Sequence, residues 1–249
     1  MSNLKLTITF DGTAYVGWQR QANGVSVQER LENALRQIYN KPIVIHGASR
    51  TDTGVHALAM IAHFHVPNDR YLPSKLLLSL NALLPPDIRV LKIQKAKKTF
   101  HARFSAKSKL YRYRILNSAI GAPFRRTITW HIHKPLNFSA MRKAARFFTG
   151  KHDFSSVAVN PGYSRTSMVR HIYRCRVLQR CDEIHIEIEA DGFLYKMVRT
   201  IVGTLVEVGL GKRPIKSIPE LLKSRNRKLA GKTAPPQGLF LVRVKYLKS

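Results

Sequence analysis

The spacing of apolar residues changes in a definite order along the first part of the chain, and this order limits the folds that it can adopt. Apolar and polar residues alternate over residues 4–10, as in a half-buried β-strand. A capping-box pattern at Ser26 then precedes apolar residues at helical spacing as far as about Tyr39. Further patterns predict strands over 42–46, 58–66 and 88–93 and a helix over 74–84 that ends at two prolines. The predicted order is β-α-β-β-α-β, which is that of a ferredoxin-like unit.

Similar elements are predicted in the remainder of the chain. They are strands over 110–116, 168–178, 184–188 and 240–246 and helices over 138–148, 193–208 and 217–223. No sequence repeat relates the two parts, but both resemble split-βαβ units. We therefore predict an α+β fold in which two ferredoxin-like halves form a largely antiparallel mixed sheet, flanked by helices, with a central active-site cleft. The predicted halves are residues 1–105 and 106–249.

The chain is strongly basic, with 43 Lys and Arg against 14 Asp and Glu and a formal net charge of +29. Between Ile88 and Cys181, Asp153 is the only acidic residue beside 22 Lys and Arg. Aromatic residues are interleaved with this charge over 100–104 and 109–114, where their rings can stack on bases beside phosphate contacts. No amphipathic basic helix with an aromatic lipid-facing side stands out. The composition therefore favours nucleic acid over a membrane surface as the partner.

Other features exclude further classes of protein. Cys175 and Cys181 make neither a disulfide framework nor, without nearby His ligands, a zinc site, so we expect reduced thiols. The acidic residues are scattered, whereas a metal-dependent nuclease needs clustered carboxylates. The N-terminus lacks the apolar core of a signal peptide, and no stretch approaches about 18 apolar residues. We expect a cytoplasmic protein.

One loop between predicted strands contains the candidate catalytic residues. It reads Gly-Ala-Ser-Arg-Thr-Asp-Thr-Gly-Val-His-Ala over residues 47–57 and places the Asp52 carboxylate beside the Arg50 guanidinium. Gly47 and Gly54 permit backbone turns that a side chain would hinder. From composition alone, the commoner role for such an aspartate is an Asx-turn, in which the side chain bonds its own backbone.

The segment Arg-Thr-Asp-Thr-Gly-Val-His at residues 50–56 closely resembles the catalytic loop of the tRNA pseudouridine synthase A family. Other segments resemble further motifs of this family, in the expected order along nearly the whole chain. They are Phe10–Gln19, Ser26–Glu29, Phe100–Ser105, Tyr111–Tyr113, Phe193–Gly203 and Gly238–Arg243. The resemblance therefore extends over both predicted halves and implies the pseudouridine synthase fold, with the catalytic loop in the first half.

The resemblance implies an enzyme that isomerises uridine to pseudouridine at positions 38, 39 and 40 in the anticodon stem-loop of tRNAs. It assigns the role of the one essential aspartate to Asp52, which can attack the sugar, attack the base or abstract a proton. All three routes need the ionised carboxylate, and we expect Arg50 or Arg199 to pair with it. No metal or organic cofactor is implied, and the sequence contains no P-loop or ligand cluster that would ask for one. Family members are homodimers in which a tRNA lies across both subunits, so we expect tRNA and a second copy of the chain as partners.

Further residues receive roles from the same resemblance. Tyr111 matches the family's pocket tyrosine, whose ring can stack on uracil, and Tyr113 should point the same way along the strand. Arg199 interrupts a predicted apolar helix, where an unpaired charge is unfavourable. Tyr111, Arg50 and Arg199 are therefore candidate substrate-binding residues. Candidate RNA contacts are Thr51, His56, Arg103 and Arg165.

Three residues depart from the family pattern. Ser49 and Thr53 stand where Gly and Ala are usual beside Asp52, and Asp191 stands where Asn is common. The first two add bulk and hydroxyl groups to the loop, and Asp191 brings a second carboxylate that can act on Asp52 through Arg199. Two alternatives stay open. One is a non-catalytic RNA-binding protein, such as an RNA chaperone or ribosome-assembly factor, which would tolerate loss of Asp52, and the other is a pseudouridine synthase that acts on another RNA.

Overall fold

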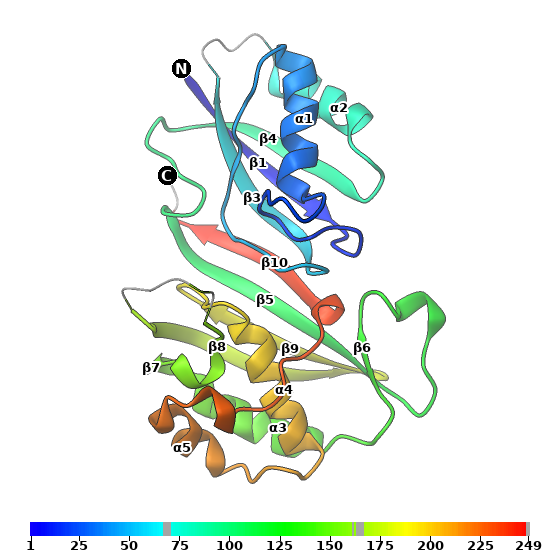
Figure 1. Ribbon diagram of the computed structural model, residues 1–249, viewed down its shortest axis with the longest axis vertical. Helices are drawn as coiled ribbons and strands as arrows, with labels where there is room; N and C mark the ends of the chain where they lie inside the picture. Colours follow the sequence, from blue (N-terminus) through cyan, green and yellow to red (C-terminus); the bar gives the residue numbers. More distant parts are fainter. Residues whose placement is uncertain (67–70, 161, 163–166, 248–249) are drawn as a thin grey trace. The chain divides into compact units, whose positions relative to one another are not determined.

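A computed structural model of the protein describes residues 1–66, 71–160, 162 and 167–247 (Figure 1). Contacts between Cα atoms divide the chain into two compact units. Unit 1 consists of residues 1–107 and 240–249, and unit 2 of residues 108–239. The halves expected from the sequence, 1–105 and 106–249, place residues 240–249 in the second half, whereas these contacts group them with the first.

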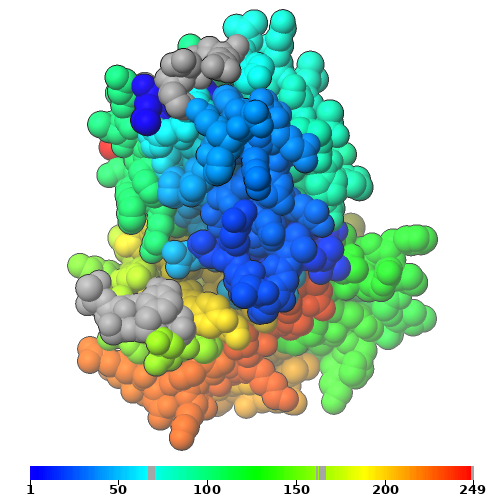
Figure 2. Space-filling view, turned by 45° about the horizontal axis from the view of Figure 1, so that its top comes forward, coloured from blue at the N-terminus to red at the C-terminus, as the bar shows by residue number. Residues whose placement is uncertain are grey.

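The described part of unit 1 contains a sheet with two helices. Its strands are β1 (Ser2–Phe10), β2 (His46–Gly47), β3 (His56–Val66), β4 (Ile88–Ala96) and β10 (Leu239–Tyr246). Their order is β4-β1-β3-β10, with β2 paired to β3, and all pairs are antiparallel except β3 with β10. Helices α1 (Val27–Tyr39) and α2 (Pro73–Leu83) lie side by side, and α2 packs against β4 (Figure 1). In Figure 2 the N-terminal residues (blue) form much of one face of this unit, with α2 (cyan) beside them.

Two features predicted for unit 1 are confirmed, the alternate burial of residues in β1 and the capping box of α1. Alternate residues of β1 from Leu4 to Phe10 are buried. Helix α1 begins with the predicted capping box, in which Ser26 Oγ accepts the Glu29 N–H and the Glu29 carboxylate accepts the Ser26 N–H. The order β-α-β-β-α-β is therefore present, although its second strand is only two residues long.

The strand predicted over residues 42–46 is wrong for all but its last residue. Ile43 and Ile45 are buried, which explains the alternating pattern. The backbone of Ile45, however, bonds to side chains and not to a neighbouring strand, since its N–H donates to Glu32 Oε1 (3.1 Å) and its carbonyl accepts from Gln28 Nε2 (3.2 Å). Two buried polar side chains of α1 thus replace a strand ladder at this position.

Unit 2 contains further strands and its own helices. Its strands are β5 (Ala106–Asn117), β6 (Trp130–Ile132), β7 (Gly150–Asp153), β8 (Val169–Arg180) and β9 (Glu183–Ala190). The order β5-β9-β8-β7 is antiparallel throughout, and β6 runs parallel to β5. The helices are α3 (Phe138–Ala145), α4 (Met197–Gly209) and α5 (Ser217–Ser224), with α3 packed on α4 and β8.

Two expectations for unit 2 need correction. The helix predicted from residue 193 begins at Met197, because Lys196 adopts a left-handed conformation (φ 57°) that no α-helix accommodates. The helix predicted over 138–148 ends at Ala145 and continues as a 3₁₀ turn, Arg146–Phe148. Strands β6 and β7 were not predicted, since three or four residues are too few to show a period.

The predicted fold class is confirmed, because the described residues form α+β units with mixed, largely antiparallel strands and helices beside them. Within the described ranges, no helix combines the length and apolar character needed to cross a membrane.

Candidate active site

The loop that carries Asp52 is hydrogen-bonded to the segment before α1. The Trp18 N–H donates to the Thr51 carbonyl (3.1 Å), and the Gly54 N–H donates to the Tyr15 carbonyl (3.3 Å). A turn within the loop is closed by the Val55 N–H, which donates to the Asp52 carbonyl (3.1 Å). The backbone is therefore fixed on both sides of Asp52, whose side chain is half-buried.

Two glycines of the preceding segment allow this close approach. A Cβ on Gly17 (φ +107°) would lie 2.5 Å from the Thr51 carbonyl oxygen, and a Cβ on Gly12 would lie 2.1 Å from the Val55 carbonyl oxygen. Either distance is shorter than any real contact, so both positions exclude side chains. The motif at residues 10–19 thus serves as the support of the Asp52 loop.

The side chains around Asp52 differ in exposure. Arg50 is exposed, Ser49 is half-buried, and the Thr53 hydroxyl donates to the Val16 carbonyl (3.1 Å). Thr51 is buried, and its Oγ1 has no hydrogen-bond partner among the residues that the structure describes.

His56 holds the end of the loop against two other segments. Its Nδ1 lies 3.0 Å from the Gly12 N–H, which donates to it, and 3.1 Å from Asp11 Oδ1. Its ring stacks on Phe240 at 4.6 Å, at the point where β10 pairs with β3. Burial of Asp11 would raise its pKa, but hydrogen bonds from Thr13 and the nearby His56 lower it overall. His56 is fully buried, so in this structure it supports the loop.

Tyr111 and Tyr113 lie on β5 in unit 2, and both are buried. The Tyr111 ring meets the Phe193 ring edge-on, with centroids 5.0 Å apart. The Tyr113 hydroxyl donates to the Pro235 carbonyl (2.6 Å), and burial raises the pKa of Tyr113 well above its usual value. Tyr113 is therefore a fixed, uncharged side chain.

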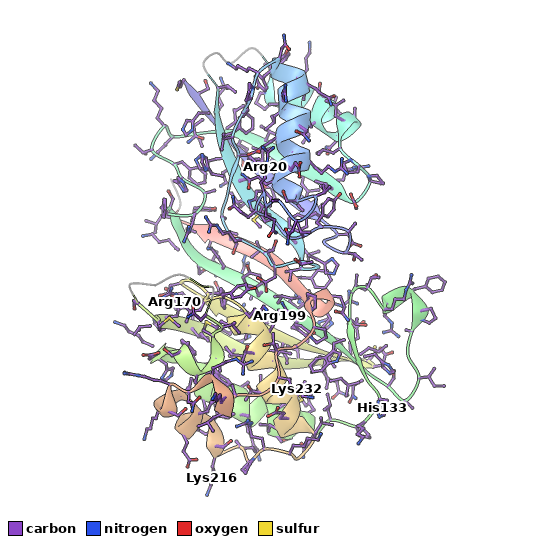
Figure 3. The ribbon with its side chains drawn as sticks, viewed as in Figure 1. Arg20, His133, Arg170, Arg199, Lys216 and Lys232 are labelled. Carbon is purple, nitrogen blue, oxygen red and sulfur yellow. The ribbon has the colours of Figure 1, made fainter. Side chains whose placement is uncertain are left out.

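Arg199 lies in the first turn of α4 (Figure 3) and is fastened to the segment 231–238. Its Nε donates to the Ala234 carbonyl (2.7 Å), and the Ala234 N–H donates to the Arg199 carbonyl (3.0 Å). Helix α4 and this segment approach so closely that a Cβ on Gly203 would lie 1.6 Å from the Lys232 carbonyl oxygen. The guanidinium thus has a fixed position in unit 2.

No role was predicted for residues 231–237. A signal for this segment is the placement of Gly231 and Gly238, because a Cβ on Gly231 would meet Thr204 Cα (2.7 Å) and one on Gly238 would meet the Tyr113 ring (2.6 Å). Isolated glycines at such positions indicate close backbone packing.

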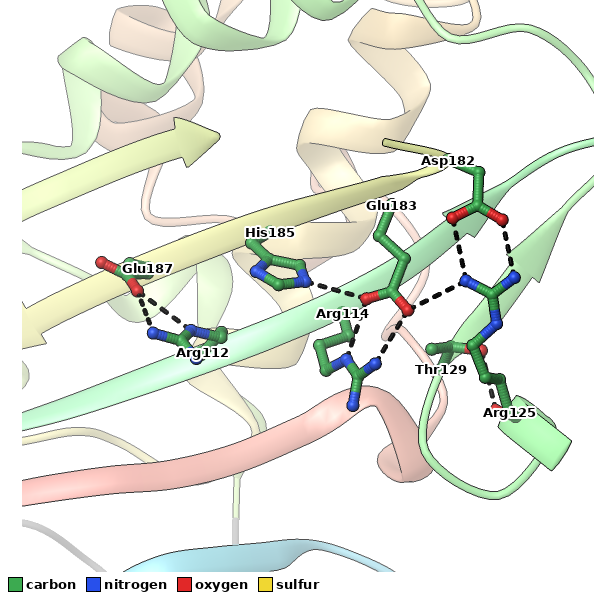
Figure 4. A network of polar contacts seen from close by, with 8 residues as sticks. All are labelled: Arg112, Arg114, Arg125, Thr129, Asp182, Glu183, His185 and Glu187. Atoms are coloured by element: carbon green, nitrogen blue, oxygen red, sulfur yellow. Dashed lines mark hydrogen bonds and ion pairs between the residues drawn. The ribbon is translucent and has the colours of Figure 1, made fainter. Parts of the chain in front are cut away.

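Several arginines of the basic central region are paired with acidic residues of β9 and the turn before it (Figure 4). Arg112 binds Glu187 (2.7 Å), Arg114 binds Glu183 (2.8 Å), and Arg125 binds both Asp182 (2.6 Å) and Glu183 (3.3 Å). Burial would raise the pKa of Glu183, but hydrogen bonds from Arg114 and His185 lower it to about 2. These arginines stabilise the sheet of unit 2.

The remaining candidate residues lie in different surroundings. Arg103 is exposed in a turn between β4 and β5, and Arg165 lies outside the described residues. The Asp191 carboxylate accepts the His171 N–H (3.0 Å). Cys175 and Cys181 are free thiols, and burial raises the pKa of Cys175 to about 12. In the described part of the chain, no group of three or more His, Cys, Asp or Glu side chains is arranged to hold a metal ion.

Comparisons with known proteins place this fold in the class of pseudouridine synthases. A family model described as tRNA pseudouridine synthase matches residues 6–105 and 144–247. A protein of Thermoanaerobacter sp. named tRNA pseudouridine synthase A is 47% identical over 246 residues, which cover 99% of this chain and 100% of the relative. A protein of the same name from Acetivibrio thermocellus is 44% identical over 250 residues, with 99% and 100% covered. This chain belongs to the tRNA pseudouridine synthase family, and the resemblance inferred from its motifs is confirmed.

Proposed function

We propose that this protein isomerises uridine to pseudouridine in tRNA, with Asp52 as its one essential carboxylate. The observation that carries the proposal is the presentation of Asp52. It is half-buried on a loop whose backbone is fixed on both sides, within a region that the family model matches. A carboxylate held in this way is pre-positioned for a reacting atom.

The reaction breaks the bond between ribose C1′ and uracil N1, turns the detached base and joins C1′ to C5. The hydrogen on C5 leaves as a proton and N1 takes up a proton, so the product is an isomer of the substrate and the reaction needs neither an oxidant nor a reductant. The Asp52 carboxylate acts as a nucleophile on the sugar or the base, or removes a proton from the sugar. Each route uses the ionised form, for which a guanidinium is the natural neighbour.

Tyr111, Arg50 and Arg199 are the substrate-binding residues of the proposal. The Tyr111 ring, held edge-on by Phe193, provides a stacking surface for uracil. Arg199, fastened through Nε, and the exposed Arg50 provide positive charge for a phosphate or for the Asp52 carboxylate. Flipping the uridine out of its stack costs roughly a few kcal/mol, which phosphate contacts offset.

The finer parts of the proposal concern the RNA and the assembly. We propose positions 38, 39 and 40 of the anticodon stem-loop as targets and a homodimer as the active form. Among the candidate RNA contacts, the exposed Arg103 can bind a phosphate. Arg165, which lies outside the described residues, is proposed as an RNA contact on the basis of the sequence alone. Thr51 and His56 are buried, which suits a supporting role beneath the loop.

The first experiment measures tritium release from unmodified tRNA labelled at C5 of uridine, because isomerisation must expel that hydrogen. Wild type should release tritium, and Asp52→Asn should lose at least about 1,000-fold in rate while binding tRNA normally. Asp153→Asn is the matched control, since asparagine keeps the acceptor for the Ser155 N–H (2.9 Å) and should leave the rate unchanged. Tight binding without release by wild type would instead identify a non-catalytic RNA-binding protein.

Two further measurements test the finer parts. Reverse transcription of carbodiimide-treated product tRNA stops next to each pseudouridine, so stops elsewhere than beside positions 38, 39 and 40 would refute the proposed targets. Sedimentation at micromolar concentration and moderate salt should give the mass of two chains, and the mass of one chain would refute the homodimer.

A further inference from the structure

Residues 101–105, between β4 and β5, form a turn whose shape depends on one imidazole. We name it the His101 turn. His101 Nδ1 accepts the N–H groups of Arg103 (3.1 Å) and Phe104 (3.3 Å). The His101 N–H donates to Ser105 Oγ (3.0 Å), and the Ser105 N–H donates to the His101 carbonyl (2.9 Å). The backbone that carries Arg103 and Phe104 is therefore held from within.

The His101 turn is also fastened to the sheet of unit 1. The Ala102 N–H donates to His63 Nδ1 (3.2 Å) on β3, and the Ala102 carbonyl accepts the Tyr246 hydroxyl (2.7 Å) from β10. Just before the turn, Asn3 Nδ2 on β1 donates to the carbonyls of Lys97 (3.0 Å) and Phe100 (2.8 Å). Side chains from three strands thus hold a short loop by its main chain.

The fixed turn presents a large aromatic ring to solvent. Phe104 is 75% exposed, and its ring rests on the His101 ring at 4.4 Å with the planes at 34°. The Arg103 guanidinium lies 5.5 Å from the centre of the Phe104 ring. A single exposed apolar side chain is ordinary, but one held on a main chain with this many side-chain hydrogen bonds is already ordered before anything binds to it.

The surroundings of the His101 turn are positively charged. Between Lys92 and Lys109, seven of the 18 residues are Lys or Arg and none is acidic. The side chains of Lys97, Lys98 and Lys107 are exposed, like that of Arg103. Aromatic rings among basic side chains are typical of surfaces that bind single-stranded nucleic acid, where bases stack and phosphates pair with cations.

The turn is also connected to the Asp52 loop within unit 1. The His46 ring lies 5.1 Å from the His63 ring and 5.6 Å from the His101 ring. His46 is followed directly by Gly47, which starts the loop that carries Asp52, and β2 pairs these two residues with β3. The His101 turn and the start of the Asp52 loop therefore contact the same histidine, His63, on β3.

We propose that Phe104 is a substrate-binding residue that stacks on an unpaired nucleobase of the RNA, with Arg103 paired to a flanking phosphate. This rests on the proposed function only in taking RNA as the substrate. An unpaired base is required because a paired, stacked base has no free face for the ring. Phe104 thus adds a contact to a base other than the target uridine, and it favours tRNAs with an unpaired base that can stack on this ring.

The test is fluorescence anisotropy with a labelled unmodified tRNA transcript and, separately, a fully paired RNA duplex. Phe104→Ala should weaken tRNA binding by about tenfold, leave duplex binding unchanged and keep the slope of log K against log salt. Phe104→Trp should retain the affinity. Arg103→Ala should weaken binding to both RNAs and reduce the slope by about 1. The matched control is Leu78→Ala on α2, which removes another exposed apolar side chain of unit 1 (72% exposed) and should have no effect.

A loss of tRNA affinity for Phe104→Ala no greater than that for Leu78→Ala would overturn the inference. Equal losses on tRNA and duplex would also overturn it, because they would indicate general damage to the surface. A change in oligomeric mass with unchanged RNA affinity would overturn it in favour of a protein contact. The binding assay does not depend on turnover, so absent tritium release by wild type would refute the proposed reaction without deciding the role of Phe104.

Discussion

The stability of unit 1 should fall with acid because His63 is buried in its neutral form. Burial, together with the neighbouring His101, His46 and His65, lowers the pKa of His63 from 6.5 to about 4. Between these two pH values the unfolded chain binds a proton that the folded chain excludes. The free energy of unfolding is therefore highest above about pH 6.5 and decreases as the pH falls towards 4.

The expected loss follows from the size of the pKa difference. The interval from 6.5 to about 4, at about 1.36 kcal/mol per pH unit, corresponds to about 3 kcal/mol. Glu183 contributes in a separate window, because its pKa is lowered from 4.5 to about 2 and its contribution is lost only below 4.5. The range between pH 7 and 4.5 consequently reports mainly on histidines.

The assay is urea unfolding from pH 7 to pH 4, followed by tryptophan fluorescence in a Trp130→Phe background. The chain has two tryptophans, and the remaining Trp18 is buried in unit 1. His63→Asn places an oxygen acceptor near the position of Nδ1 but does not titrate. The His63→Asn variant should be less stable at pH 7, because a buried ring is lost. Its free energy of unfolding should, however, decrease by about 3 kcal/mol less than that of wild type between pH 7 and pH 4. His133→Asn, at an exposed position, is the control and should keep the wild-type profile. An unchanged slope in His63→Asn would refute the reasoning.

Three further predictions follow from the packing and charge of the described residues. Gly203→Ala should destabilise unit 2 by roughly 3 kcal/mol or more, because its Cβ would overlap the Lys232 carbonyl oxygen at 1.6 Å, and thermal unfolding should show a lower Tm. Glu183→Gln should cost roughly 1–3 kcal/mol in urea unfolding at pH 7, since it weakens a buried hydrogen-bonded ion pair, and an unchanged midpoint would contradict this. The tRNA affinity should fall roughly 1,000-fold or more between low and moderately high salt. Lys98→Ala should reduce the slope of log K against log salt by about 1. Arg112→Ala should leave this slope unchanged, because the Arg112 guanidinium is already paired with Glu187 at 2.7 Å.

The sequence correctly predicted those elements that depend on interactions among residues close together in the chain. The alternation over residues 4–10 and the capping box at Ser26 each report the burial or hydrogen bonding of the element itself, and both are present. Residues 42–45 show the limit of this reasoning. Their apolar alternation reports burial correctly, but whether a buried extended segment joins a sheet depends on what bonds to its backbone, and here Gln28 and Glu32 do so.

The candidate site shows the same limit. The motif around Asp52 could be located from the sequence, whereas the contacts that hold it come from residues some 35 to 40 positions earlier, such as Gly12 and Gly17. From the sequence, His56 is a candidate RNA contact. In the structure its ring stacks on the ring of Phe240 at 4.6 Å, and Phe240 lies near the far end of the sequence. Contacts between such distant residues leave no periodic signal in a single sequence.

The distribution of charge gains a different meaning once pairing is known. The basic stretch between Ile88 and Cys181 appears almost free of acids only because it stops one residue before Asp182. The acids that follow, on the β8–β9 turn and on β9, pair back onto Arg112, Arg114 and Arg125. The net charge of residues 88–181 therefore overstates the number of cationic side chains in unit 2 that are available to bind RNA. Residues 92–109, by contrast, contain the His101 turn and its exposed lysines but no acidic residue. We therefore place an RNA contact there.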